Sequence, residues 1–365
     1  MRHNRQEKLI SGCSVAGIMN ESGRKTSGEA IIRSIAVMKE RSNGLGGGFS
    51  AYGIYPEFKD YFAFHMMYDN KKAMADAEEY LKTNYRVVKS EEISTIEDKS
   101  IKNRPLLWRY FIGLKDKVKN LHYDLTEEDI VVNDVMKINV EIEGAFVTSS
   151  GKNMGIFKGI GYPEDIGRYY KLEEYEAYIW IAHGRFPTNS VGWWGGAHPF
   201  GLLNWSVVHN GEISSYGINK RYLENFGYRC SLFTDTEVIL YLFDLLVRKH
   251  GLPFDIVCKI IDAPLWEEID RNDDNDEREL LKTLRIIYSS ALINGPFSII
   301  ISDGNIMMGL NDRVKLRPLV SLKDGDTVYM ATEESAIREI CKSDKEIYYS
   351  KSSEPIVGRL KEGLS

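Results

Sequence analysis

The sequence has little cysteine and no long run of apolar residues. Its 365 residues include four cysteines and no C-x-x-C pair, which argues against a disulfide framework and against an iron–sulfur site. The longest apolar run, 238–247, is short and contains Asp244, and residues 1–12 lack the apolar core of a signal peptide. We therefore expect a reduced, cytoplasmic protein without a membrane span.

An excess of positive charge is also missing. The formal net charge is −6, which argues against a protein that binds the phosphate backbone of nucleic acids. The common nucleotide-binding loops are absent, because Gly12 to Gly17 is followed by Ile18 and the glycine-rich stretch 44–49 does not match G-x-G-x-x-G. A hydrophobic content of 43% still permits a sizeable core.

Apolar periodicity predicts strands and helices that occur in runs. Strands are expected at 13–19, 49–56, 61–69, 135–150, 175–185, 202–209, 297–304, 305–310 and 326–332. Helices are expected at 30–42, after a capping box from Thr26 to Glu29, and at 73–85, 220–227, 234–251 and 333–341. Runs of this kind favour an antiparallel α+β arrangement over a doubly wound parallel sheet.

Cys13 is the best candidate for a nucleophile. Cutting the bond after Gly12 would leave Cys13 with a free α-amino group, whose pKa of about 7.7 to 8.0 suits a general base beside its own thiol. The alternative is that Cys13 is a small buried hydrophobic residue.

The stretch 183–237 supplies polar residues that can bind an amino acid. Arg185 follows a predicted strand and can hold a carboxylate with two parallel hydrogen bonds, although surface arginines are commonly solvated. Thr188 and Asn189 can add polar contacts from the same loop. The histidines of this stretch, at 183, 198 and 209, match none of the usual zinc spacings, so we predict no metal site.

Two further positions in this stretch have both a structural and a functional interpretation. Asn210 and Gly211 can donate two N–H groups to an oxyanion, or form a tight hairpin turn, and the two interpretations are compatible. Asp235 can pair with a substrate ammonium group. It can also stabilise a helix N-terminus next to a capping box from Thr234 to Glu237.

Several segments resemble the class II glutamine amidotransferases, in the same order along the chain. They are GCSVAGIMN, AHGRFPTNS, GAHPF, VVHNGEIS, FTDTEVI, NDRVKLRPLV and MATEESAI. Within this family, the length and the segment 20–65 look like the separate amidotransferase subunit of archaeal-type glutamate synthases. The resemblance implies an N-terminal nucleophile hydrolase fold, a four-layer αββα sandwich of two antiparallel sheets.

The resemblance also implies glutamine hydrolysis through a thioester on Cys13. Arg185 and its loop would bind the α-carboxylate of glutamine, Asn210 and Gly211 would form the oxyanion hole, and Asp235 would hold the α-ammonium group. No cofactor is expected in this chain. The ammonia would pass to a glutamate synthase partner subunit that carries FMN and iron–sulfur clusters.

Residues 1–12 are predicted to be a propeptide, and 13–365 the amidotransferase domain, with 89–125 as a possible insertion that docks a partner. Many members of the family need to remove only an initiator Met to expose the cysteine, whereas twelve residues precede Cys13 here. We therefore expect the Cys13 thiol to attack the preceding carbonyl and release the leader. Other functions stay open. They are an amidotransferase for amino sugar, purine, asparagine or N-methylglutamate synthesis, an amidase for other substrates, and an inactive relative that binds glutamine for regulation.

Overall fold

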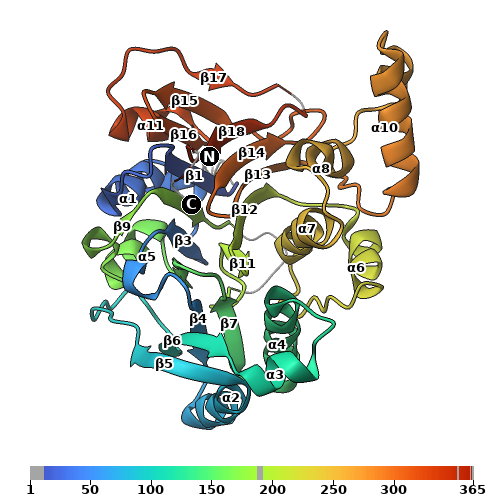
Figure 1. Cartoon of the computed structure of the whole chain (residues 1–365). Coiled ribbons are helices and arrows are strands. Elements are labelled where there is room, and N and C mark those ends of the chain that lie inside the picture. The colour runs from blue at the N-terminus through green and yellow to red at the C-terminus, as the bar shows by residue number, and fades with distance from the viewer. Residues whose placement is uncertain (1–11, 187–191, 352, 362, 364–365) are drawn as a thin grey trace, which may run out of the picture.

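The computed structural model describes residues 12–186, 192–351, 353–361 and 363 (Figure 1). The predicted leader therefore lies outside the described residues except for Gly12, and so do Thr188 and Asn189. Within the described ranges, no helix combines the length and the apolar character needed to cross a membrane.

The central sheet consists of seven antiparallel strands among the described residues, in the order β17-β15-β16-β1-β10-β3-β8. Its members are β1 (Ser14–Asn20), β3 (Gly47–Tyr52), β8 (Met154–Gly159), β10 (Ile179–Gly184), β15 (Val320–Asp324), β16 (Thr327–Ala331) and β17 (Tyr348–Tyr349). Both β1 and β10 are buried along their whole length, which is why their sequences show apolar runs and no alternation.

A second antiparallel sheet packs against the first. Its strands, in the order β11-β12-β13-β14-β18, are β11 (Phe200–Leu202), β12 (Trp205–Gly211), β13 (Phe297–Ser302), β14 (Ile306–Asn311) and β18 (Ile356–Arg359). The space between the sheets is filled by a cluster that includes Val15 and Ile181 from one sheet and Val208, Ile300 and Met307 from the other. This packing holds the ends of β1, β10 and β12 close to one another.

Helices cover the outer faces of both sheets, as Figure 1 shows. The seven-stranded sheet carries α1 (Glu29–Ala36), α5 (Pro163–Tyr169) and α11 (Glu334–Ile340). The other side carries α6 (Tyr216–Glu224), α7 (Asp235–Phe243), the π-helical segment η4 (Asp244–Lys249), α8 (Phe254–Ile261), α9 (Trp266–Asp270) and α10 (Asn275–Ile287). The predicted four-layer αββα sandwich is confirmed.

A further unit lies at the bottom of Figure 1 and contains most of the segment 89–125. Its sheet, in the order β5-β6-β4-β7, is formed by β4 (Phe62–Tyr68), β5 (Tyr85–Glu92), β6 (Leu106–Leu114) and β7 (Ala145–Ser149). Its helices are α2 (Lys71–Asn84), α3 (Asp116–Leu121) and α4 (Glu127–Glu141). The segment is thus built into a sheet, and its docking role stays a prediction.

Short elements complete the chain. They are the two-stranded pair β2 (Thr26–Ser27) and β9 (Glu176–Ala177), and the 3₁₀ turns η1 (Lys39–Arg41), η2 (Pro56–Phe58) and η3 (Leu172–Glu174).

Two local predictions are wrong. The predicted strand at 135–150 is divided, since its first half belongs to α4, where Val131, Val135 and Ile138 are buried at helical spacing. The predicted capping box at Thr26 does not form, because Thr26–Ser27 pairs with β9 and no side chain caps α1. In both places, tertiary pairing or burial outweighs the local pattern.

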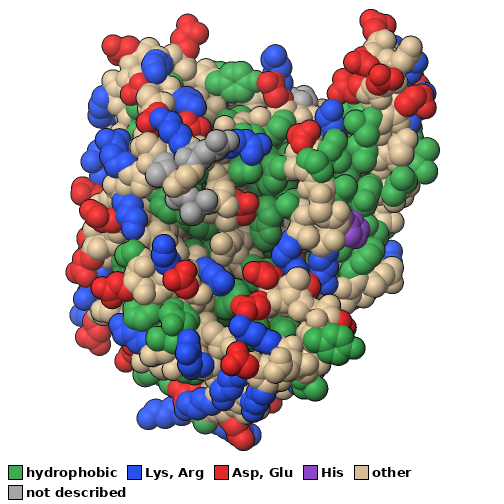
Figure 2. All heavy atoms as spheres, in the orientation of Figure 1, with side chains coloured by type: hydrophobic (Ala, Val, Ile, Leu, Met, Phe, Trp, Pro, Cys, Tyr) green, Lys and Arg blue, Asp and Glu red, His purple; other side chains and the backbone are tan. Residues whose placement is uncertain are grey.

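Hydrophobic side chains gather on the surface near α8 and α10 in Figure 2. Helix α10 buries Leu281 and Leu284 but leaves Ile286 and Ile287 exposed. Trp266 of α9 is also exposed.

Candidate functional site

The register of β1 and β10 brings Cys13 and Arg185 to the same end of the central sheet. Ser14 lies opposite Gly184 in this antiparallel pair, so the next residues outward, Cys13 and Arg185, are neighbours. The Cys13 sulfur accepts a hydrogen bond of 3.4 Å from the backbone N–H of Phe186. The Cys13 carbonyl accepts one of 3.3 Å from Nε of Arg41.

Cys13, Arg185 and Phe186 line a pocket of about 390 Å³. Four of the residues predicted from the sequence line it together: Cys13, Arg185, Gly211 and Asp235. The rest of the lining consists of Phe186, His198, His209, Glu212, Ile213, Tyr216, Phe233, Thr234 and Thr236. The lining therefore includes a cysteine, an arginine and two acidic residues, Glu212 and Asp235.

The Cys13 thiol is protonated in this environment. Burial raises its pKa, and the N–H of Phe186 and the charges of Arg185 and Arg317 offset this only in part. Burial likewise lowers the pKa of Arg185, although the charge of Asp235 acts in the opposite direction. A protonated thiol is a weak nucleophile, so attack by Cys13 requires a base.

Asn210 and Gly211 lie in a strand and not in a hairpin turn. They pair with Ser298 and Phe297 of β13 as the last two residues of β12, so the hairpin interpretation is wrong. Gly211 has φ of 149°, and a Cβ atom there would lie 1.9 Å from the carbonyl oxygen of Pro296, so only glycine fits.

The side chain of Asn210 has an unused donor. Its Nδ2 atom is buried, and no described residue accepts a hydrogen bond from it. A buried N–H group without a partner is rare because it costs free energy. Such a group is what an oxyanion site needs before substrate arrives.

The Asp235 carboxylate is the anionic end of the pocket. Its Oδ2 accepts a hydrogen bond of 3.0 Å from the N–H of Ile213, and its Oδ1 lies 3.5 Å from Nδ1 of His209. Burial alone would raise its pKa, but His209 and the N–H of Ile213 outweigh that effect and lower it. Asp235 is therefore ionised at neutral pH.

Helix α7, which begins at Asp235, is capped differently from the prediction. Thr234 accepts a hydrogen bond from the N–H of Thr236, as a capping residue does, but Glu237 does not complete the box. Glu237 instead accepts hydrogen bonds from the N–H groups of Ser231 and Leu232 at 3.1 and 3.0 Å. It thereby holds the segment before the helix, which forms one wall of the pocket.

Replacement of Glu237 by glutamine is expected to destabilise the protein by about 1–3 kcal/mol. Both side-chain oxygens accept backbone N–H bonds, so an amide would place its NH₂ group against one of these donors. Chemical denaturation would measure the loss. The exposed Glu267→Gln serves as the control, and equal stability of the two variants would contradict the role of Glu237.

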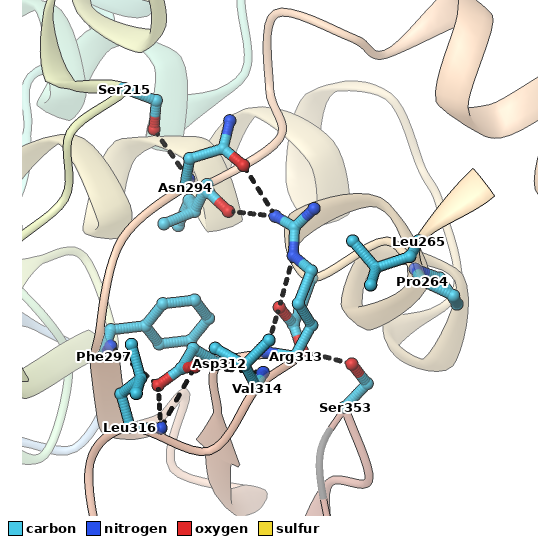
Figure 3. Close-up of polar contacts among 12 residues, drawn as sticks. Ser215, Pro264, Leu265, Asn294, Phe297, Asp312, Arg313, Val314, Leu316 and Ser353 are labelled. Atoms are coloured by element: carbon cyan, nitrogen blue, oxygen red, sulfur yellow. Dashed lines mark hydrogen bonds and ion pairs between the residues drawn. The ribbon is translucent and has the colours of Figure 1, made fainter. Parts of the chain in front are cut away.

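Figure 3 shows how the turn after β14 is anchored. The Asp312 carboxylate accepts hydrogen bonds from the N–H groups of Phe297 and Leu316, at 3.2 and 3.0 Å. Arg313 donates to Oδ1 of Asn294 at 2.9 Å. These contacts hold the segment that precedes β13, and β13 in turn pairs with the end of β12 where Asn210 and Gly211 lie.

Sequence reasoning missed other residues of the site. Thr236 and His198 line the pocket, and Arg317 acts on Cys13 through its charge. Among the histidines of the stretch 183–237, His198 and His209 line the pocket. Across the described ranges, no group of three or more His, Cys, Asp or Glu side chains is arranged to hold a metal ion.

A family model described as "Glutamine amidotransferases class-II" matches residues 51–238, about half of the chain. The chain belongs to this family. This class II glutamine amidotransferase is 50% identical over 358 residues to an "Uncharacterized protein" of Archaeoglobus fulgidus, covering 97% of this chain and 94% of that protein. It is 24% identical over 291 residues to the "Glutamate synthase [NADPH] large chain" of Bacillus subtilis, covering 72% of this chain but 18% of that protein.

Among solved structures, the amidotransferase resembles the glutamine phosphoribosylpyrophosphate amidotransferase from B. subtilis, with a TM-score of 0.46 and 14% sequence identity. The match covers 95% of this chain and 47% of that one. The family model itself does not reach Cys13. The register of β1 and β10 is what places this cysteine next to Arg185.

Proposed function

We propose that this amidotransferase hydrolyses L-glutamine to glutamate and ammonia and supplies the ammonia to a glutamate synthase partner subunit. The observation that supports it most strongly is the pocket, where Cys13, Arg185, Gly211 and Asp235 line one space next to the unused amide donor of Asn210. These groups match the two ends of glutamine.

The zwitterionic end of glutamine binds between the two charged side chains. Arg185 holds the α-carboxylate, since its planar guanidinium group can make two parallel hydrogen bonds to it. Asp235, which is ionised, holds the α-ammonium group. Thr188 and Asn189 lie outside the described residues, and their contribution to carboxylate binding stays a prediction. With this end held, the side-chain amide extends toward Cys13.

The chemistry takes place at the amide end. The Cys13 sulfur attacks the amide carbon while its α-amino group takes the thiol proton, and the oxyanion accepts hydrogen bonds from Asn210 and Gly211. The amine returns the proton to the leaving nitrogen, so that ammonia departs and a thioester remains. Water then attacks the thioester, which releases glutamate and restores the thiol.

A glutaminase assay tests the first half of the proposal. Purified protein is incubated with L-glutamine, and glutamate and ammonia are measured separately. The proposal requires equal amounts of both. If amides other than glutamine are hydrolysed faster, the protein is an amidase with a different substrate.

The mechanism requires that the Gly12–Cys13 bond be cut. Arg41 lies beside this bond, because its Nε donates to the Cys13 carbonyl and a Cβ atom on Gly12 would lie 3.2 Å from its Nη2. In the proposed reaction, the Cys13 thiol attacks the Gly12 carbonyl, and the Gly12–Cys13 C–N bond breaks to leave a thioester and a free α-amino group that takes the thiol proton. Water then hydrolyses the thioester, which releases residues 1–12 and restores the thiol.

The intact mass of active protein is therefore expected to correspond to a chain that begins at Cys13. The variant Cys13→Ala should retain residues 1–12, because it lacks the attacking thiol. Mass spectrometry of both preparations measures this directly. Active enzyme that keeps residues 1–12 would rule out the free-amine mechanism.

The partner is supported by the relative from B. subtilis. This chain matches 18% of that glutamate synthase large chain. In the proposal, a separate subunit with FMN and iron–sulfur clusters supplies the synthase reaction and combines ammonia with 2-oxoglutarate.

Mixing the amidotransferase with such a subunit, 2-oxoglutarate and a reductant tests the partnership. Glutamate formation should then exceed the glutamine consumed, since each glutamine yields two glutamates. If the mixture forms no complex and free ammonia accumulates as before, the acceptor belongs to another biosynthetic reaction.

A further inference from the structure

A buried chain of polar groups lies behind the Asp235 carboxylate. Nε2 of His198 lies 2.7 Å from the hydroxyl oxygen of Thr236, and this oxygen lies 3.4 Å from Oδ1 of Asp235. Nδ1 of His209 lies 3.3 Å from the same hydroxyl oxygen and 3.5 Å from Oδ1 of Asp235. Thr236 is completely buried although it lines the pocket, and its hydroxyl group bonds to these neighbours.

The unpaired ring nitrogens decide the direction of these hydrogen bonds. Nδ1 of His183, Nδ1 of His198 and Nε2 of His209 are all buried without a described partner. A buried N–H without an acceptor costs more than a bare lone pair, so Nδ1 of His183 and Nδ1 of His198 are unprotonated. In a neutral imidazole the other nitrogen then carries the hydrogen. In His209, the nitrogen with described partners is Nδ1, which therefore carries a hydrogen.

The charge state of the rings fits this assignment. Burial lowers the pKa of His183 to about 3 and that of His198 well below its ordinary value, so both are neutral. His183 then donates through Nε2 to the carbonyl of His209, at 3.0 Å, and its ring stacks on that of His198 at 4.0 Å. His183 thus holds the His198 ring in place.

The hydroxyl group of Thr236 has one hydrogen, and it is directed at Asp235. His198 donates to the Thr236 oxygen through Nε2–H, so the hydroxyl hydrogen is free to reach Oδ1 of Asp235. Nδ1–H of His209 also faces Oδ1 of Asp235, at 3.5 Å, and the N–H of Ile213 donates to Oδ2. The protein side of the carboxylate is thus occupied by donors, which leaves its other lone pairs for the pocket.

We propose that Thr236, supported by His198 and His209, is a positioning residue that aims the Asp235 carboxylate at the α-ammonium group of the substrate. This inference rests on the proposed function, because it assigns the amine end of glutamine to Asp235. Thr236 itself takes no part in the attack on the amide. Its loss should weaken substrate binding through the amine and leave the chemical step largely intact.

Two variants of Thr236 separate positioning from packing. Thr236→Val has nearly the same shape but no hydroxyl group, whereas Thr236→Ser keeps the hydroxyl group and loses a methyl group. We expect Thr236→Val to raise KM for glutamine about tenfold with kcat within about threefold of the wild type. Thr236→Ser should stay within about threefold in both constants. The opposite order, with Ser worse than Val, would assign Thr236 to packing alone.

An analogue without the α-amino group gives the decisive readout. Glutaramate, the monoamide of glutarate, keeps the carboxylate and the amide of glutamine but offers Asp235 nothing to hold. The inhibition constant of glutaramate should be the same in wild type and Thr236→Val, while the affinity for glutamine itself falls in the variant. If Thr236→Val weakens both molecules by the same factor, the positioning role is wrong.

A binding measurement keeps this test separate from the proposed function. L-Glutamate carries an α-amino group and glutarate lacks it, so calorimetric titration with the two ligands measures the contribution of the amine without turnover. Wild type should bind L-glutamate more tightly than glutarate, and the ratio of the two Kd values should shrink about tenfold in Thr236→Val. Protein that shows the preference but no glutaminase activity would refute the proposed function alone. Active protein whose preference is unchanged in Thr236→Val would refute this inference alone.

Discussion

Replacing Cys13 by alanine is expected to lower glutamine hydrolysis by at least about 10³-fold, because the covalent route through a thioester is lost. Arg185 and Asp235 remain in place, so glutamine should still bind. Both proteins are expressed from residue 13, so that a retained leader does not affect the comparison. Ammonia release measures the first effect, and calorimetry measures the second.

Cys341→Ala is the matched control for this experiment. Cys341 is a free, buried cysteine that packs in the cluster between the seven-stranded sheet and its covering helices, outside the pocket lining. Its replacement should leave kcat and KM near wild-type values. Hydrolysis that survives in Cys13→Ala would place the nucleophile elsewhere.

Replacing Asn210 by alanine is expected to lower kcat by about 10²–10³-fold, the usual cost of losing one oxyanion donor. Its Nδ2 atom has no partner among the described residues, so the replacement also removes a buried unsatisfied group. Relief of that cost, about 1–3 kcal/mol, offsets the lost packing. Activity should therefore fall steeply while the free energy of unfolding changes by about 1 kcal/mol or less.

Asn219→Ala should show the reverse pattern and is the control for Asn210. The Asn219 amide is also buried, but its Nδ2 donates to the carbonyls of Ser290 and Leu292 at 2.7 and 3.0 Å. Its loss leaves two acceptors unpaired, so stability should fall while kcat holds. Steady-state kinetics and chemical denaturation of both variants measure this contrast. A large loss of stability in Asn210→Ala with unchanged kcat would assign Asn210 to the framework.

The sequence predicted elements best where a local signal agreed with the final environment. Strand β1 and the start of α7 at Asp235 follow from apolar runs and from a threonine cap. The prediction was wrong for Asn210–Gly211, because a pair that favours tight turns occupies the end of a strand. There, pairing with β13 supplies the backbone hydrogen bonds that a turn would otherwise provide.

The sequence by itself determined the reactive groups of this protein and their order: a thiol, a guanidinium group, an amide and a carboxylate on separate segments. It also determined the apolar runs and periods that predict the strands and helices. The tertiary structure alone decided that the thiol, the guanidinium group and the carboxylate line one pocket together with Gly211, because the contact of Cys13 with Phe186 depends on the register of two strands far apart in the chain.

The tertiary structure also decided which polar groups are left without partners. Whether Asn210 has a free donor, or whether the Thr236 hydroxyl group points at Asp235, depends on every neighbour that packing brings within hydrogen-bond distance. No local pattern contains that information, since hydrogen bonds and burial are properties of the assembled core.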